Sequence, residues 1–478
     1  MSLALIDPVD ASLPVVPVMT DGYDAWLLTQ PAPVQRWLQD IGYKAKDGQS
    51  AILSGADGGI AQVLIGVGKT IRPWAFGSLP YELPARSYHL ASDNPELCDA
   101  AALGWALGAY RFDRYKKADR QPAELVWPEA ANRKAVEGTA EAVHLIRTLI
   151  NTPAEDMGPP ELAAAAEALA GRFGAAFRCV VGENLLKENF PAIHMVGRAA
   201  AKAPRLIDLT WGDESAPKVT LVGKGVCFDT GGLNIKTGGG MTMMKKDMGG
   251  SAHVLGIAHM IMAAGLPVRL RVLIPAVENN ISGNAYRPMD VVPTRKGLTV
   301  EVGNTDAEGR VVLADALALA SEENPAMIMD FATLTGAARV ALGTELPGLF
   351  CNDDGLAADV LAGADRTGDP LWLMPLWKPY GRMIESKVAD ITNSTGSPYG
   401  GSITAALFLE HFVGEDIPWG HIDVMAWNLS AKPGRPEGVK HKVRVQYSMQ
   451  YRNVLLRRIS GQLFIVNHFL VARLPHDS

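Results

Sequence analysis

The chain has 478 residues, of which 48% are hydrophobic and 20% charged, and its net charge is −6. This length allows two or three domains with a sizeable core, and the negative charge provides no general attraction to nucleic acid or to an anionic membrane. The N-terminus has no basic start, and no apolar run reaches the roughly 18 residues of a membrane span, so neither a secretory signal nor a membrane helix is expected. Four scattered cysteines without a C-x-x-C pair favour a reducing, cytoplasmic setting.

Residues 1–127 indicate a small N-terminal α/β domain. This part is rich in proline, glycine and aromatic residues, with short apolar runs at residues 51–54, 61–66 and 101–109. It contains no catalytic constellation. Residues 128–150 predict a linker helix, because good helix formers are frequent and apolar side chains recur at helical spacing. Pro153 discourages helix at the residue before it and so predicts where this helix ends.

Residues 151–478 predict a second, larger domain in which strands and helices alternate. Helices are expected at residues 159–172, 184–189, 247–264 and 310–323, and strands at residues 176–181, 205–211, 218–222, 268–277, 297–302 and 326–332. This rhythm predicts an α/β fold with a mostly parallel central sheet sandwiched by helices. In such sheets, ligands bind beyond the carboxyl ends of the strands. We expect two polar loops, residues 224–229 and 304–310, at that edge.

The loop at residues 304–310 concentrates charge, because Asp306, Glu308 and Arg310 lie at alternate positions in a glycine-bearing stretch. Two carboxylates packed together repel, and a divalent cation between them relieves the repulsion. More lysines and aspartates lie in the glycine-rich region of residues 223–248. The complete set of candidate residues is Lys224, Asp229, Lys236, Asp247, Asp306, Glu308 and Arg310.

Two interpretations of this set are open. It could form an ordinary salt-bridge network, or its four carboxylates could hold two divalent cations that activate a water for attack on a carbonyl or phosphoryl centre. A dication lowers the pKa of a neighbouring lysine, which could then be a ligand, while a second, charged lysine could polarise the carbonyl. The sequence has no Gly-x-Ser-x-Gly and no complete phosphate-binding loop, which disfavours a serine hydrolase or an NTPase.

Several stretches resemble the leucyl aminopeptidase (cytosol aminopeptidase) family of dinuclear metallopeptidases. They are residues 222–236, 244–248, 278–288, 304–310, 332–336 and 399–405, within a region of about residues 150–436. The resemblance implies two divalent metal ions per subunit, Mn²⁺ or Zn²⁺. Lys224, Asp229, Asp247 and Glu308 would hold the tighter ion, and Asp229, Asp306 and Glu308 the more exchangeable one. Lys236 would polarise the scissile carbonyl, and Arg310 would hold a bicarbonate ion as general base.

The resemblance also implies the activity: hydrolysis of the N-terminal residue, Leu or another hydrophobic one, from peptides by a water that bridges the metals. Met244, Thr333, Leu334 and Gly336 would line the pocket for the side chain of that residue. A homohexamer of two-domain subunits is implied as well.

Two features depart from the family pattern. Thr237 stands where the family commonly has proline, and residues 439–478 form an atypical tail in which basic and apolar residues mix. The tail leaves room for a DNA-binding accessory role, although the acidic net charge makes nucleic acid an unexpected partner. A metal phosphoesterase is a third possibility, since the same metal chemistry serves phosphoryl centres.

Overall fold

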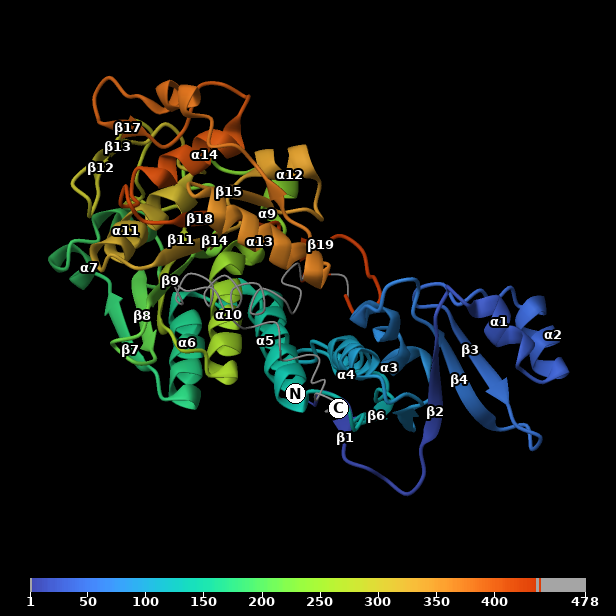
Figure 1. Cartoon of the computed structure of the whole chain (residues 1–478). Coiled ribbons are helices and arrows are strands. Elements are labelled where there is room, and N and C mark those ends of the chain that lie inside the picture. The colour runs from blue at the N-terminus through green and yellow to red at the C-terminus, as the bar shows by residue number, and fades with distance from the viewer. Residues whose placement is uncertain (1, 436–437, 440–478) are drawn as a thin grey trace, which may run out of the picture. The chain divides into compact units, whose positions relative to one another are not determined.

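The computed structural model describes residues 2–435 and 438–439, so the atypical tail lies outside the described residues apart from its first position. The chain forms two compact units (Figure 1). One contains the chain up to Asn151 and the returning segment that starts at Trp427, and the other runs from Thr152 to Ala426. In the described part of the chain, no helix combines the length and the apolar character that a bilayer crossing requires.

The N-terminal unit is built on a six-stranded sheet with the strand order β1-β6-β5-β2-β4-β3. Its strands are β1 (Leu5–Ile6), β2 (Leu13–Val18), β3 (Ser50–Ser54), β4 (Ile60–Gly66), β5 (Ser87–Leu90) and β6 (Glu124–Val126). Its helices are α1 (Tyr23–Leu28), α2 (Ala32–Asp40), α3 (Leu79–Glu82), α4 (Pro95–Ala109) and α5 (Arg133–Asn151), with a 3₁₀ helix at Pro73–Phe76. Trp105 of α4 is fully buried and its Nε1 donates to Ala123 O at 2.8 Å. The expected small α/β domain is confirmed.

Helix α5 begins at Arg133 rather than at residue 128. The side chain of Asn132 accepts a hydrogen bond from Ala135 N at 3.2 Å and so caps the first turn. The residues before Asn132 form a turn, which composition alone could not separate from the helix. By its contacts α5 belongs to the N-terminal unit, and its role as a linker stays a prediction.

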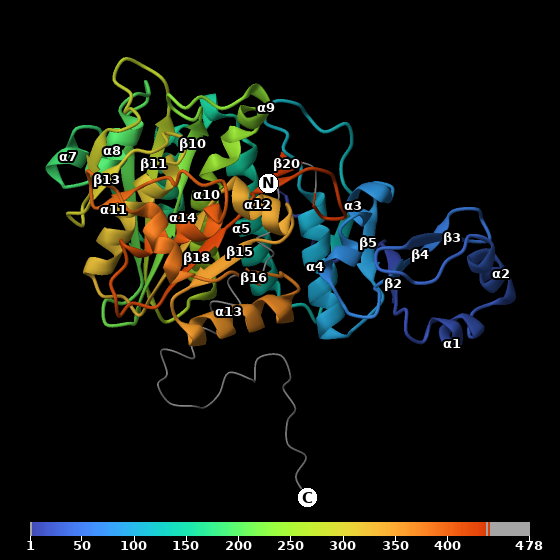
Figure 2. The same cartoon turned by 90° about the horizontal axis from the view of Figure 1, so that it is seen from above.

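The C-terminal unit contains a nine-stranded sheet with the order β16-β15-β18-β14-β9-β11-β8-β7, and β10 pairs with β11. Figure 1 and Figure 2 show this unit from two directions, and each labels some of these strands. The strands are β7 (Ala176–Val181), β8 (Arg205–Trp211), β9 (Lys218–Gly223), β10 (Gly225–Asp229), β11 (Arg269–Asn279), β14 (Met327–Ala332), β15 (Gly348–Cys351), β16 (Trp372–Leu373) and β18 (Trp419–Asp423). Pairing is parallel through the centre, from β18 to β11, and antiparallel where β8, β7 and β15 join. The α/β fold is therefore confirmed, with a mixed sheet.

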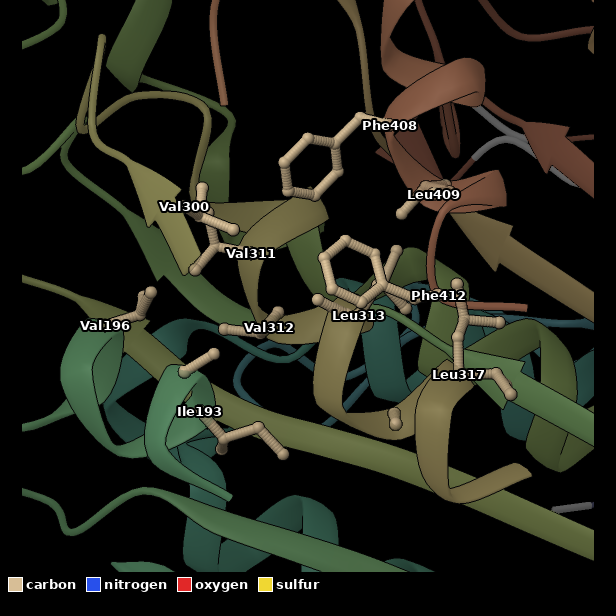
Figure 3. Packing of buried hydrophobic residues seen from close by; sticks show 14 of the residues in the cluster. Ile193, Val196, Val300, Val311, Val312, Leu313, Leu317, Phe408, Leu409 and Phe412 are labelled. Atoms are coloured by element: carbon tan, nitrogen blue, oxygen red, sulfur yellow. The ribbon is translucent and has the colours of Figure 1, made fainter. Parts of the chain in front are cut away.

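Helices cover both faces of this sheet. α6 (Pro159–Phe173) and α10 (Gly249–Ala264) pack on one face, and α8 (Pro191–Gly197) and α11 (Glu308–Glu322) on the other. α14 (Gly401–Glu410) packs against α11. Shorter helices are α7 (Asn184–Lys187), α9 (Gly238–Met241) and α12 (Gly336–Leu342), and α13 (Asp354–Thr367) packs against β15. Figure 3 shows apolar side chains of α11 gathered with those of α8 and α14 in one buried cluster. Because Glu308 and Arg310 lie in the first turn of α11, this packing fixes the backbone positions from which their side chains extend.

A separate three-stranded sheet contains β12 (Val291–Pro293), β13 (Thr299–Glu301) and β17 (Ile391–Thr392). The polar loop at residues 304–310 follows β13, so the expectation that it extends a strand of the central sheet is wrong. Local periodicity identifies a strand but does not say which sheet it joins. The remaining elements are β19 (Trp427–Asn428), β20 (Gly438–Val439) and 3₁₀ helices at Ala154–Asp156, Met244–Met248 and Lys378–Ile384.

Candidate metal centre

The first half of the centre forms around the ammonium group of Lys224. This lysine is the single residue between β9 and β10, and only 3% of it is exposed. Its Nζ lies 2.8 Å from Asp247 Oδ2 and 2.8 Å from Glu308 Oε1, and it donates to Thr333 O at 3.1 Å. Burial alone would lower the pKa of Lys224, but Asp247, Glu308 and Asp229 outweigh burial and hold the pKa above its ordinary value. The lysine thus joins three segments that are distant in sequence.

Lys236 forms the second half with Asp229 and Asp306. Its Nζ lies 2.8 Å from Asp229 Oδ2 and 2.5 Å from Asp306 Oδ1. The other oxygen of Asp229 accepts hydrogen bonds from Gly231 N and Asn279 Nδ2, both at 2.8 Å, which fixes the orientation of the carboxylate. Gly231 has a φ of +88°, and a Cβ there would lie 2.4 Å from a backbone carbonyl oxygen, so this turn requires glycine.

Three of the carboxylates converge. One oxygen from each of Asp229, Asp306 and Glu308 lies within 4.8 Å of the others. Burial, followed by repulsion from Asp229, raises the pKa of Glu308 to about 8 and the pKa of Asp306 to about 6. Glu308 Oε2 is buried and has no hydrogen-bond partner among the described residues. Crowded, desolvated carboxylates with an unpaired oxygen fit a divalent cation, and oxygen ligands with one amine suit Mn²⁺ or Zn²⁺.

The loop that carries Asp306 is held by Asn393, which directly follows β17. Asn393 Oδ1 accepts from Gly303 N at 2.8 Å and from Asn304 N at 3.2 Å, and its Nδ2 donates to Asn304 O at 2.8 Å. Sequence reasoning missed this residue. A lone asparagine carries no pattern, and only the pairing of β17 with β13 brings it to the loop.

Arg310 lies beside the centre, in the first turn of α11. Its Nη1 donates to Asn393 O at 2.8 Å, and its Nε is buried without a hydrogen-bond acceptor among the residues that the structure describes. Burial lowers the pKa of Arg310 to about 10, with Glu308 acting in the opposite direction, so the guanidinium stays charged at neutral pH. A charged, partly buried guanidinium with an unused donor fits an oxyanion such as bicarbonate.

Among the residues expected to line a substrate pocket, Thr333 is tied most closely to the centre. Its Oγ1 donates to the backbone oxygen of Asp247 at 3.0 Å and to Asp247 Oδ1 at 2.8 Å. Leu334 follows and packs, partly buried, against the main core, and Gly336 opens α12 and is exposed. Met244 opens the 3₁₀ helix that also holds Asp247, and this shared helix is its link to the centre. The structure therefore brings the ionisable set together, and among the four expected pocket residues Thr333 is the one that is hydrogen-bonded to it.

The fold and the site define a two-unit α/β protein with a candidate divalent-metal centre. Residues 144–445 match the model of the cytosol aminopeptidase family, catalytic domain. Residues 13–128 match the model of the M17 aminopeptidase N-terminal domain. The chain therefore belongs to the cytosol aminopeptidase family, as the resemblance of its motifs implied.

Named relatives agree with this membership. The chain is 42% identical over 368 residues to a "Probable cytosol aminopeptidase" of Roseiflexus castenholzii, which covers 73% of this chain and 75% of that protein. It is 39% identical over 434 residues to "Leucine aminopeptidase 2, chloroplastic" of Arabidopsis thaliana, covering 83% of this chain and 74% of that protein. These relationships support peptidase activity in this chain.

Solved structures give the same result. A crystal structure of a cytosol aminopeptidase from Coxiella burnetii superposes with a TM-score of 0.88 at 48% identity, covering 96% of this chain and 100% of that one. The bottromycin maturation enzyme BotP in complex with Mn superposes with a TM-score of 0.83 at 34% identity, covering 93% of this chain and 99% of that one.

Proposed function

We propose that this protein is a metal-dependent aminopeptidase that hydrolyses the N-terminal residue, Leu or another hydrophobic one, from peptides. The observation that carries the proposal is the convergence of Asp229, Asp306 and Glu308 within 4.8 Å, beside two lysines that each contact two carboxylates. Membership of the cytosol aminopeptidase family supports peptide substrates, and the manganese in the BotP structure supports a divalent cation.

The proposed ligands divide into two overlapping sets. Lys224, Asp229, Asp247 and Glu308 would hold one ion, and Asp229, Asp306 and Glu308 the other. Two bound ions, Mn²⁺ or Zn²⁺, would supply an activated bridging water and a Lewis acid for the scissile carbonyl. Lys224 can be a ligand only as a neutral amine, so its proton has to leave Nζ when the site fills. Unpaired Glu308 Oε2 is a ligand atom that needs no rearrangement to become available.

Lys236 and Arg310 would act on the reacting groups. The side chain of Lys236 is 15% exposed and reaches the space between Asp229 and Asp306, so its ammonium can donate to the oxygen of a carbonyl bound there. Such a donor stabilises the negative charge that develops on that oxygen during attack. Arg310 would hold bicarbonate, the base that the family resemblance implies, through its unpaired Nε.

The pocket and the assembly extend the same proposal. Met244, Thr333, Leu334 and Gly336 would contact the side chain of the N-terminal residue, and apolar Met244 and Leu334 favour a hydrophobic one. We also propose a cytoplasmic homohexamer. The word cytosol in the names of relatives supports this location, while the chloroplastic name of the Arabidopsis relative places that protein elsewhere.

The experiment measures hydrolysis of a leucyl peptide and of its N-acetylated form by metal-stripped protein with added Mn²⁺ or Zn²⁺. We expect metal-dependent release of leucine from the free peptide only, since an acetylated amine is no longer a free N-terminus. The Lys236→Ala, Arg310→Ala double variant should lose most of this activity. Lys69→Ala, a change at an exposed lysine of the N-terminal unit, is the matched control and should keep it.

Two outcomes would contradict the proposal. Full activity of the double variant would show that neither side chain takes part. Turnover of phosphate esters without peptide hydrolysis would favour the phosphoesterase interpretation. The DNA-binding alternative depends on the tail at residues 439–478, and a salt-dependent mobility shift with and without that tail tests it separately.

A further inference from the structure

We propose that Asp423 is a positioning residue that fixes the pocket segment at residues 333–335 relative to the metal centre. This inference deepens the proposed function and rests on it. Asp423 is the last residue of β18 and is 5% exposed. It lies opposite Ala332, the last residue of β14, in the parallel pair of these strands. The segment that leaves β14 therefore passes directly beside the carboxylate of Asp423.

Both oxygens of Asp423 are used by this segment. Its Oδ1 accepts from Leu334 N at 3.1 Å and from Thr335 N at 3.3 Å, and its Oδ2 accepts from Thr335 Oγ1 at 2.6 Å. Hydrogen bonds to a buried carboxylate are stronger than those between neutral groups. Three such bonds from two consecutive residues leave the backbone of residues 334–335 little freedom to turn.

One peptide unit is held from both of its polar ends. The carbonyl oxygen of Thr333 accepts from Lys224 Nζ at 3.1 Å, and the N–H of Leu334, in the same peptide plane, donates to Asp423 at 3.1 Å. In a trans peptide the C=O and N–H groups point in opposite directions, so any rotation of the plane weakens one contact or both. Lys224 and Asp423 thus hold this peptide between the expected metal site and the end of β18.

Thr335 connects Asp423 to the start of helix α12 through hydrogen bonds. Its Oγ1 donates to Asp423 and accepts from Ala338 N at 3.0 Å, which makes it the N-cap of this helix. Gly336, an expected pocket residue, is the first residue of α12. The carboxylate of Asp423 therefore sets the positions of Leu334 and Gly336 together, without contacting any of the expected metal ligands among the described hydrogen bonds and ion pairs.

Asp330 offers a matched control. It is a second buried aspartate in the same pair of strands, with its oxygens bonded to His421 Nδ1 at 2.5 Å and Trp419 Nε1 at 2.7 Å. Its partners lie within the sheet and not in the pocket segment. Asp330→Asn therefore perturbs a buried carboxylate of similar kind, and should lower the melting temperature without changing the recognition of substrate.

The test compares Asp423→Ala, the shape-preserving Asp423→Asn, Thr335→Val and Asp330→Asn in the full chain. Three quantities are measured: Mn²⁺ affinity by calorimetric titration, kcat and KM for leucyl, methionyl and alanyl p-nitroanilides, and amide hydrogen exchange of residues 333–342. We expect Asp423→Ala to raise KM for the leucyl substrate by about tenfold or more and to reduce its preference over the alanyl one. Mn²⁺ affinity and kcat should change much less, and amide exchange in the segment should accelerate.

Asp423→Asn and Thr335→Val should change KM and exchange in the same direction by smaller factors. Their effects in the double variant should be smaller than the product of the single effects, since both variants alter the hydrogen bond between Thr335 Oγ1 and Asp423 Oδ2. Unchanged exchange of residues 333–342 in Asp423→Ala would overturn the inference, as would an equal KM effect of Asp330→Asn. The inference would also be overturned if Asp423→Ala lowered Mn²⁺ affinity and left KM and amide exchange unchanged. An inactive wild-type protein would refute the proposed function, while the exchange measurement would still decide whether Asp423 holds the segment.

Discussion

The contact between Gly309 and Lys224 yields the sharpest test of the centre. Gly309 is the second residue of α11 and is buried directly after Glu308. A Cβ at this position would lie 2.6 Å from both Cε and Nζ of Lys224, closer than real Cβ atoms approach other heavy atoms. Lys224 cannot swing into solvent, because it is 3% exposed and contacts Asp247, Glu308 and Thr333. Gly309→Ala must therefore displace the ammonium from its partners.

Two opposing terms set the magnitude. Alanine is favoured over glycine in a helix by up to about 1 kcal/mol, which would stabilise α11. Removing one partner of a buried ion pair costs about 3–5 kcal/mol, and a displaced lysine that keeps part of its contacts costs a fraction of that. We expect Gly309→Ala to lower the free energy of unfolding by about 1–3 kcal/mol. Since Lys224 is also an expected ligand, Mn²⁺ affinity should fall by at least about tenfold.

Urea unfolding and calorimetric Mn²⁺ titration measure the two effects. Gly171→Ala in α6 is the control, because a Cβ there meets nothing within 4 Å and only helix propensity changes. The control should be as stable as the wild type or slightly more so, with the same Mn²⁺ affinity. If Gly309→Ala behaved like Gly171→Ala in both measurements, Lys224 would be neither a constrained group nor a ligand.

Three further perturbations test other parts of the structure. Asp315→Asn should lower the free energy of unfolding by about 1–3 kcal/mol in urea, because the aspartate accepts three backbone N–H groups and an amide would turn its NH₂ toward one of them. Asn393→Ala should weaken Mn²⁺ binding severalfold in a calorimetric titration, since the loop at residues 303–307 loses its side-chain anchor. Removal of divalent metal with a chelator should lower the melting temperature in scanning calorimetry, and Mn²⁺ should restore it in the wild type but much less in Glu308→Gln.

Much of the fold could be predicted because its signals are local. The apolar runs of β9 and β14 mark buried strands, and the predicted helix at residues 310–323 differs from α11 by two residues at its start. That difference matters, since it places Glu308 in the helix rather than in the loop before it. The ionisable set was found because its residues cluster in a few glycine-rich stretches, where spacing alone restricts their arrangement.

The remainder depends on contacts between distant residues. Helix α8 was not predicted. The N–H groups of Ala192 and Ile193 at its start donate to the carboxylate of Asp315, which lies far along the chain, so no local pattern shows this contact. Asn393 directly follows β17, and Asp423 is the last residue of β18. Neither residue has a spacing that marks it as functional. Each acts on a loop that another strand brings beside it. Pairing of strands across sheets is therefore the information that the local pattern lacks.

The geometry also bears on the choice between a salt-bridge network and a metal centre. Lys224 and Lys236 do form ion pairs, and Lys246 Nζ lies 4.0 Å from Asp247, yet Glu308 Oε2 is left buried without a hydrogen-bond partner among the described residues. Burying charge is costly, and apolar residues of similar volume often stabilise a fold as well as a buried ion pair does. Burial and the nearby Asp229 raise the pKa of Glu308, so a cation placed against this carboxylate would stabilise its charged form. The buried oxygen of Glu308 therefore supports the proposed cation, whose place the lysines would take only in part.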